Sequence, residues 1–241
     1  MSNVQTTPTK SKAQSASQKL WLPATPSLEQ GDRLIRREFE RRYEAMPHLK
    51  KAELIEGVVH MSSPVSLVSH GFPHGQIMTF LGVYYAATPG VIFGDNASVL
   101  LDSANEVQPD ALLRLDENSG GQSSMNEKGY VVGAPELIIE IAASSVSYDM
   151  YDKFKVYQRN GVQEYVVWQI YDKRLDWFVL KDEAYVPLRP DEDGVICSRS
   201  FPGLQLAVTA LLTGDMKGVL DTLQQGLASK EHAEFSSRLQ D

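Results

Sequence analysis

The sequence contains almost no cysteine. Cys197 is the one cysteine among 241 residues, so the chain can form neither an intrachain disulfide nor a cysteine-rich zinc site. This usage is typical of a reducing compartment. We therefore expect a cytoplasmic protein that is stabilised by its core rather than by covalent cross-links.

Positive charge is also scarce. The 23 Lys and Arg residues are outnumbered by 31 Asp and Glu residues, which gives a formal net charge of −8. A protein that coats nucleic acid neutralises many phosphates with Lys and Arg, so the acidic balance disfavours that class. The balance is compatible with an enzyme that contacts a few phosphates through a local basic patch.

Long apolar runs are missing as well. The N-terminal segment is rich in Ser, Thr, Gln and Lys and lacks the apolar core of a secretory signal. No Asp, Glu, Lys or Arg lies between Glu56 and Asp95, but the best apolar run there, about 77–87, is shorter than the ~20 residues that a bilayer requires. We expect a soluble protein with no membrane partner, in which this run forms a buried helix.

The hydrophobic pattern predicts a single domain over residues 27–228, with a flexible tail at 1–26 and a C-terminal tail at 229–241. Strand pairs interrupted by helices indicate a mixed α/β sheet, the fold class that we expect. Helices are predicted from Ser27 onward, over 69–87, over 148–160, and in a C-terminal stretch that aligns Met216, Leu220, Leu223 and Leu227. Strands are predicted over 52–55, 58–61, 91–93, 97–101, 111–115, 136–142, 164–170 and 175–180, with a polar loop over 116–129 and a further strand pair before Phe201.

Two carboxylates stand out in this pattern. Glu140 lies inside an apolar run, where an unpaired ionised carboxylate would cost several kcal/mol, so it needs a cation, a metal or a hydrogen-bond network. Pairing with a structural arginine is the alternative. Asp110 opens the strand at 111–115. If the two strands are neighbours, both carboxylates and the backbone carbonyl of Ile141 would offer the hard oxygen ligands that Mg²⁺ takes beside water.

Two lysines follow Glu140 on the predicted helix 148–160. At about 100° per residue, Lys153 lies at the border of the buried stripe that contains Met150, whereas Lys155 lies on the solvent face. Lys153 is therefore the lysine that can reach the carboxylates. The alternative is a snorkelling lysine that pairs with Asp149 one turn back.

Histidines and arginines provide two weaker signals. His70 and His74 have the i, i+4 spacing of a metal-binding pair, but Pro73 between them places His70 before the helix begins. His74 is then a hydrogen-bonded core histidine, or it supports a metal ligand. The arginines of the first predicted helix form either a phosphate-contacting patch or, because acids are interleaved with them, a solvated helix face.

The order and spacing of these motifs resemble the Uma-two family of bacterial restriction endonucleases, a branch of the PD-(D/E)XK nuclease superfamily. The resemblance covers about residues 27–228. The matching stretches are Glu53–Gly57, the helix start that contains His74, Pro109-Asp110, Ile139–Ser145, Asp149, Lys153, Tyr157, Gly161–Tyr165 and Phe201–Leu204.

The resemblance implies a restriction-endonuclease-like core with flanking helices, and metal-dependent hydrolysis of phosphodiester bonds, most simply in DNA. The resemblance also implies that Asp110 and Glu140 hold Mg²⁺, with Mn²⁺ as the alternative ion. Lys153 would orient the attacking water and stabilise charge at the scissile phosphate, and Glu53 would assist the metal or its water. A bound cation lowers the pKa of its water, and a lysine neutralises the charge that develops on the phosphate.

Two positions depart from the superfamily pattern. The usual lysine stands two residues after the acid, where this chain has Ala142, so Lys153 must replace it from the helix. Many relatives have an acid after the glycine of the first motif, where this chain has Val58. Glu56 is therefore either a further acid of the site or a turn residue.

A second class of function is a non-catalytic nucleic-acid-binding or protein-interaction module that keeps the nuclease fold. The acidic net charge and the lack of an appended base-reading motif favour it. A metal hydrolase built on His70 and His74 is a third and weaker hypothesis. If the protein cuts both strands of DNA, a two-fold homodimer is the natural arrangement.

Overall fold

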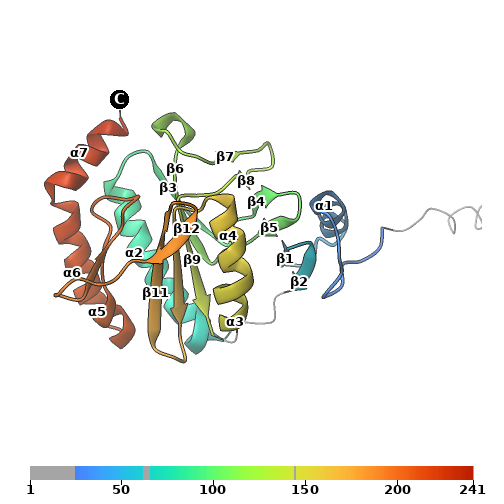
Figure 1. Cartoon of the computed structure of the whole chain (residues 1–241), viewed down its shortest axis with the longest axis horizontal. Helices are drawn as coiled ribbons and strands as arrows, with labels where there is room; N and C mark the ends of the chain where they lie inside the picture. Colours follow the sequence, from blue (N-terminus) through green and yellow to red (C-terminus); the bar gives the residue numbers. More distant parts are fainter. Residues whose placement is uncertain (1–24, 62–65, 144, 241) are drawn as a thin grey trace, which may run out of the picture.

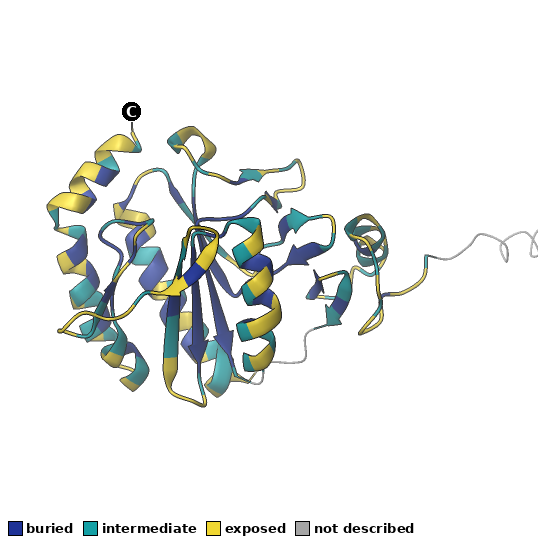
Figure 2. Ribbon diagram, in the orientation of Figure 1, coloured by how far each residue is buried: buried dark blue, intermediate teal, exposed yellow. Residues whose placement is uncertain are grey.

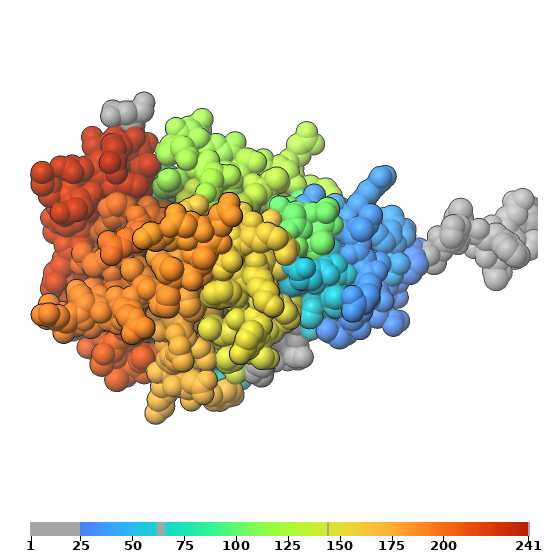
Figure 3. Space-filling model, viewed as in Figure 1, coloured from blue at the N-terminus to red at the C-terminus, as the bar shows by residue number. Residues whose placement is uncertain are grey.

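The structure is a computed structural model and describes residues 25–61, 66–143 and 145–240. Nearly all of the predicted tail 1–26 lies outside these residues. Figure 1 shows the N-terminal elements at one end of the molecule and the C-terminal helices at the other, and the space-filling view in Figure 3 shows the same order. Within the described ranges, no helix is long and apolar enough to cross a membrane.

A six-stranded sheet forms the centre of the molecule, in the order β12-β11-β10-β9-β6-β3. Its neighbouring strands β9 and β10 are parallel, and its other pairs are antiparallel. In chain order the strands are β3 (Val91–Asp95), β6 (Ala111–Leu115), β9 (Leu137–Ala142), β10 (Glu164–Gln169), β11 (Arg174–Lys181) and β12 (Ala184–Pro187).

A second six-stranded sheet has the order β2-β1-β5-β4-β8-β7, and two further strands form a separate hairpin. The second sheet is antiparallel except for β4 and β8. Its strands are β1 (Ala52–Ile55), β2 (Val58–Met61), β4 (Val99–Asp102), β5 (Asn105–Val107), β7 (Ser124–Met125) and β8 (Val131–Val132), and the hairpin consists of β13 (Val195–Cys197) and β14 (Gln205–Ala207).

Helices cover both faces of the central sheet (Figure 1). One face packs against α2 (Phe72–Ala87) and against the C-terminal helices α5 (Val208–Thr213), α6 (Met216–Leu227) and α7 (Lys230–Arg238). The other face packs against α4 (Phe154–Asn160). The central strands β9 and β10 are buried along their whole length, and Figure 2 shows the middle of the sheet in dark blue.

Alternation along β9 decides which residues face which layer. Successive strand residues point to opposite faces, and Leu137, Ile139 and Ile141 accordingly pack in the core beneath α2 and α6. Ile138 and Ala142 pack in the core beneath α4. Glu140 stands between them on the α4 face, so its carboxylate is directed toward the helix that carries Lys153.

The helix predicted over 148–160 is present, but it is not a uniform α-helix. It begins as α3 (Val146–Tyr148), widens into a π-helical turn over Asp149–Lys153, and continues as α4. Gly161 ends it in the left-handed conformation, at φ 84°, as a C′ glycine does. A second π-helical turn over Leu67–Gly71 precedes α2. Such turns are often found at functional sites.

The first predicted helix starts later than expected. Helix α1 spans Arg36–Glu44 rather than beginning at Ser27. The preceding segment is extended because it pairs with β2: Arg33 forms a bridge to Val58, and Leu34 N donates to Gly57 O at 2.7 Å. Pairing with a distant strand thus keeps these residues extended, although their local sequence pattern predicts a helix.

The C-terminal region also differs from the prediction. The expected helix that aligns Met216, Leu220, Leu223 and Leu227 is present as α6, and Gly214, at φ 80°, separates it from the shorter helix α5. Part of the segment 229–241, which was expected to be a tail, forms α7. Ser229 caps this helix, and Phe235 is only 6% exposed. The polar loop over 116–129 contains a short 3₁₀ turn (Glu117–Ser119) and β7, and β5 was not predicted.

Candidate active site

A cavity of about 1030 Å³ lies between β1, the π-helical turn before α2, the end of β9 and the turn that carries Lys153. Glu53, Asp110, Glu140 and Lys153, which the sequence analysis placed in one site, all line it. The four side chains thus lie around one cavity. Their chemical roles are a separate question.

Sheet register explains why the two central carboxylates meet. Strands β6 and β9 are antiparallel, with Ala111 opposite Ile139, and continuation of this register places Asp110 opposite Glu140. Residues opposite each other across a strand pair have Cβ atoms about 5 Å apart. Ile141 N donates to Asp110 Oδ2 at 2.9 Å, which fixes the Asp110 side chain at the end of β9.

Lys153 occupies the centre of the acid cluster. Its Nζ lies 2.9 Å from Glu140 Oε1, 3.1 Å from Glu53 Oε1 and 3.7 Å from Asp149 Oδ1. Burial alone would lower the pKa of Lys153, but the carboxylates raise it well above its usual value, so the ammonium is charged. Lys155 is exposed, as its predicted place on the solvent face requires.

Glu140 is held by two donors at one oxygen. Tyr157 OH donates to Glu140 Oε1 at 2.8 Å, and Lys153 Nζ donates to the same atom. Burial, together with the nearby carboxylates, raises the pKa of Glu140 to about 8 against the opposing effect of Lys153. The network that a buried glutamate needs is thus formed by a lysine and a tyrosine of one helix, and the structural arginine is not its partner.

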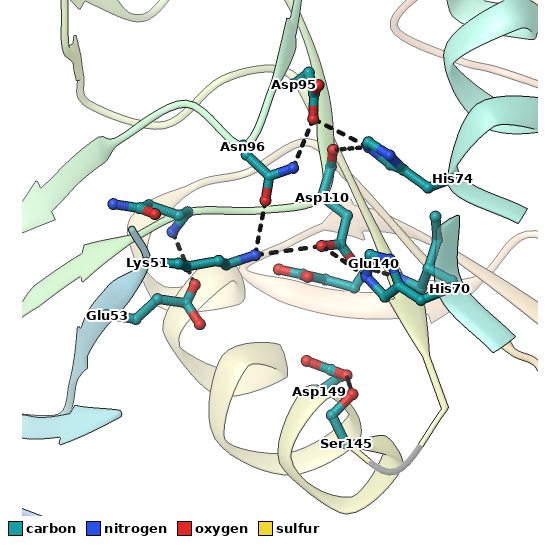
Figure 4. A network of polar contacts seen from close by, with 12 residues as sticks. Lys51, Glu53, His70, His74, Asp95, Asn96, Asp110, Glu140, Ser145 and Asp149 are labelled. Atoms are coloured by element: carbon teal, nitrogen blue, oxygen red, sulfur yellow. Dashed lines mark hydrogen bonds and ion pairs between the residues drawn. The ribbon is translucent and has the colours of Figure 1, made fainter. Parts of the chain in front are cut away.

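Asp110 contacts a lysine and a histidine that lie outside the helix carrying Lys153. Its Oδ1 lies 3.3 Å from Lys51 Nζ and 3.2 Å from His70 Nε2, as Figure 4 shows. Burial raises the pKa of Asp110, but the hydrogen bond from His70 and the charge of Lys51 outweigh it, so this pKa lies well below its usual range. Asp110 is therefore ionised at neutral pH.

Glu53 and Glu56, both in the first motif, lie in different surroundings. Glu53 is 6% exposed, and its Oε1 accepts a hydrogen bond from Gln108 N at 2.8 Å. Glu56 is an exposed turn residue at φ 51°, and it pairs with Arg159 at 2.7 Å. Glu56 does not line the cavity, so only Glu53 belongs to the candidate site.

The two histidines have unequal surroundings. His74 Nε2 lies 2.8 Å from Asp110 O and 3.1 Å from Asp95 Oδ1. Both partners are acceptors, so Nε2 carries the proton and supports the backbone at Asp110. His70 belongs to the π-helical turn that precedes α2, in agreement with the expectation that it lies before the helix.

The arginines of α1 interact mainly with acids of the same region. Arg41 and Arg42 pair with Glu38, and Arg36 pairs with Glu40. This arrangement favours the solvated helix face over the phosphate-contacting patch.

Several cavity residues escaped the sequence analysis. Lys51 and Asn96 belong to the same network as Asp110 (Figure 4). His60 lines the cavity and its ring packs 4.5 Å from that of Tyr148. Asp149, considered only as a helix partner of Lys153, is 3% exposed and accepts from Ser145 Oγ. The sequence marks Lys51 only by its position two residues before the first motif.

The donor set fits a hard divalent cation. In the described ranges, no group of three or more His, Cys, Asp or Glu is arranged to hold a metal by itself. Mg²⁺ does not require one, because it is usually held by one or two carboxylates together with waters and substrate phosphates. Asp110 and Glu140 are two such carboxylates on one cavity wall, and the hydrogen bonds from Lys153 and Tyr157 to Glu140 both involve Oε1.

Comparison with known proteins identifies the family of the chain. The model of the family Uma2, described as "Putative restriction endonuclease", matches residues 36–209. The chain belongs to the Uma2 family. The match contains Glu53, Asp110, Glu140 and Lys153, and it confirms the resemblance that the motifs indicated.

A solved structure shares the Uma2 fold seen here. It is a protein from Anabaena variabilis ATCC 29413 described as "a putative nuclease belonging to DUF820", with a TM-score of 0.55 and 13% sequence identity. The alignment covers 72% of this chain and 96% of that one. The nuclease-type core expected from the sequence is therefore confirmed at the level of the fold. No curated protein matches the chain significantly.

Proposed function

We propose that this Uma2 protein is a divalent-metal-dependent endonuclease that hydrolyses phosphodiester bonds in DNA. One observation carries the proposal: a fully buried lysine lies among three carboxylates, beside a fourth carboxylate, in a single cavity. Burying an ionised group costs free energy unless an opposite charge pairs with it. Clusters of buried ionisable groups are therefore common at functional sites. Family membership supplies the reaction class.

Asp110 and Glu140 are the residues that would hold Mg²⁺ or Mn²⁺. The bound cation would supply a water of lowered pKa and charge stabilisation at the phosphate. Lys153 bridges Glu140 and Glu53, and Tyr157 fixes the orientation of Glu140. Glu53, held by Gln108 N, is placed to accept a proton from water.

The test is cleavage of supercoiled plasmid with Mg²⁺ or Mn²⁺. Wild type should nick the plasmid only when metal is present. Asp110→Ala, Glu140→Ala and Lys153→Met should each lower the rate by at least about 10²-fold, because each removes a charge from the reaction centre. Lys155→Met is the matched control, since it removes an exposed lysine from the same helix, and it should cut like wild type.

Two outcomes would contradict the proposal. Equal nicking by wild type and all three site variants would place the activity outside this cavity. DNA binding without nicking, and without a metal-linked rise in melting temperature, would favour the non-catalytic module instead, because a ligand that binds the folded state must stabilise it.

A further inference from the structure

Lys51 is a cavity cation to which the proposed reaction assigns no role. It directly precedes β1, and its side chain is 23% exposed, against 4% for Lys153. Its Nζ donates to Asn96 Oδ1 at 2.9 Å and to Asp110 Oδ1 at 3.3 Å. In Figure 4 the ammonium lies between these two side chains. An ammonium has three N–H donors, so one more acceptor can be bound.

Lys153 is poorly suited to contact a substrate. Its Nζ already lies within 3.7 Å of three carboxylates. If it moved to a phosphate, it would have to leave these buried contacts with Glu140, Glu53 and Asp149. Its position indicates that it holds the carboxylates in place.

We propose that Lys51, not Lys153, contacts the scissile phosphate, and that it exchanges Asp110 for the phosphate when a divalent cation binds. This inference rests on the proposed nuclease function. In the metal-free protein the ammonium partly neutralises Asp110. The ammonium of Lys51 would be repelled by a cation held at Asp110 and attracted to an incoming phosphate.

Two neighbours suit this exchange. Asn96 is a neutral acceptor, so it can keep one N–H of Lys51 whether or not a cation is present. His70 Nε2 lies 3.2 Å from Asp110 Oδ1, and Ile141 N donates to Asp110 Oδ2. Asp110 therefore keeps its orientation after Lys51 has moved away.

The exchange makes a prediction that a structural lysine would not share. Lys51→Met removes a positive charge that competes with the cation at Asp110, so Mg²⁺ should bind several-fold more tightly, to an order of magnitude. The same change removes a phosphate contact, so nicking of supercoiled plasmid should slow by about 10²-fold at saturating Mg²⁺. Tighter metal binding with slower cleavage is the expected signature.

The measurements are a calorimetric titration with Mg²⁺ alone and the plasmid assay on the full chain. Lys50→Met is the matched control, because Lys50 is an exposed lysine on the same cavity wall and no side-chain contact to an acid is described for it. It should leave Mg²⁺ affinity and cleavage near wild type. Lys51→Arg keeps the charge and should recover part of the lost rate.

The outcomes separate this inference from the proposed function. Suppose that wild type nicks plasmid. If Lys51→Met then nicks equally fast, or binds Mg²⁺ more weakly than wild type, the role of Lys51 is overturned and the nuclease assignment remains. Wild type that neither binds Mg²⁺ nor nicks would overturn both. A lower melting temperature in Lys51→Met but not in Lys51→Arg, with unchanged Mg²⁺ affinity, would identify a purely structural lysine.

Discussion

Individual buried acids in this protein are stabilised in very different ways. Glu164 is fully buried and accepts hydrogen bonds from Trp177 Nε1, Ser198 Oγ and Arg199 N, at 2.6 to 2.9 Å. Glu106 on β5 is 2% exposed, and its Oε2 has no hydrogen-bond partner among the residues described. Burial and the nearby charge of Glu40 raise the pKa of Glu106 to about 7.

The pKa of Glu106 predicts a pH dependence of stability. Below its ordinary pKa of 4.5, Glu106 is protonated in the folded and unfolded chain alike. As the pH rises from about 4.5 to 7, the unfolded chain ionises first, so the folded state loses stability, by up to ~3 kcal/mol. Above the folded-state pKa the loss is constant.

Glu106→Gln removes this loss. Urea unfolding at pH 4.5 and pH 7.5 should give a difference in unfolding free energy, variant minus wild type, that becomes more favourable by up to ~3 kcal/mol at the higher pH. A difference that is the same at both pH values would mean that Glu106 ionises equally in the folded and unfolded chain.

At the scale of the elements, α6 is held against the turn over Phe201–Gly203 by a close backbone approach. A Cβ added at Gly226 would lie 2.2 Å from the backbone oxygen of Gly203, and a Cβ at Gly203 would lie 2.9 Å from Gly226 O. Glycine normally weakens a helix interior by about 1 kcal/mol relative to alanine. Here the absence of a side chain is what permits the contact.

Two glycines in different helices, Gly226 in α6 and Gly75 in α2, predict opposite effects. Gly226→Ala should lower the free energy of unfolding by about 2 kcal/mol, because backbone must move to admit the methyl group. Gly75→Ala in α2 should raise it by about 1 kcal/mol, since a Cβ there meets nothing within 4 Å. Chemical denaturation of the two variants tests this pair. Two changes of the same sign would contradict the packing argument.

The elements differ in how well the sequence predicts them. Strands β1, β2 and β6 have the predicted bounds, because their patterns are local. The start of α1 could not be predicted, since the preceding residues are extended only by pairing with β2. The π-helical turn that brings Lys153 inward leaves no mark in a 3.6-residue period.

The same distinction holds for the candidate site. Glu140 could be found because a charge within an apolar run is a local anomaly. Lys51 could not be found from the sequence, because a lysine before a strand is common. Its contact with Asp110 forms only when the two sheets lie side by side in the folded chain.

At the scale of the whole molecule, the C-terminal helix α7 packs against residues that lie far from it in the sequence. This helix buries Phe235 and His232, and His232 Nε2 lies 2.9 Å from Thr88 Oγ1 at the end of α2. Ser119 Oγ also donates to Leu239 O at 3.1 Å. The last helix thus contacts elements from the first half of the chain.

Removal of α7 should destabilise the entire fold. A chain that ends at residue 228 exposes the apolar surface that Phe235 covers, and its free energy of unfolding should fall by about 3 kcal/mol or more. The measurement is thermal unfolding of the shortened chain and of wild type. Glu234→Ala, which changes an exposed residue of α7, is the control. Unchanged stability of the shortened chain would support the original expectation of a C-terminal tail.

The buried lysine has a consequence for the order of assembly. Glu53, Asp110 and Glu140 lie on or beside three different strands, and all of them are synthesised before Lys153. A chain that collapsed around these strands alone would gather three negative charges with no buried cation to offset them. We therefore expect these carboxylates to come together only with the helix that carries Lys153, whose ammonium contacts Glu140 and Glu53.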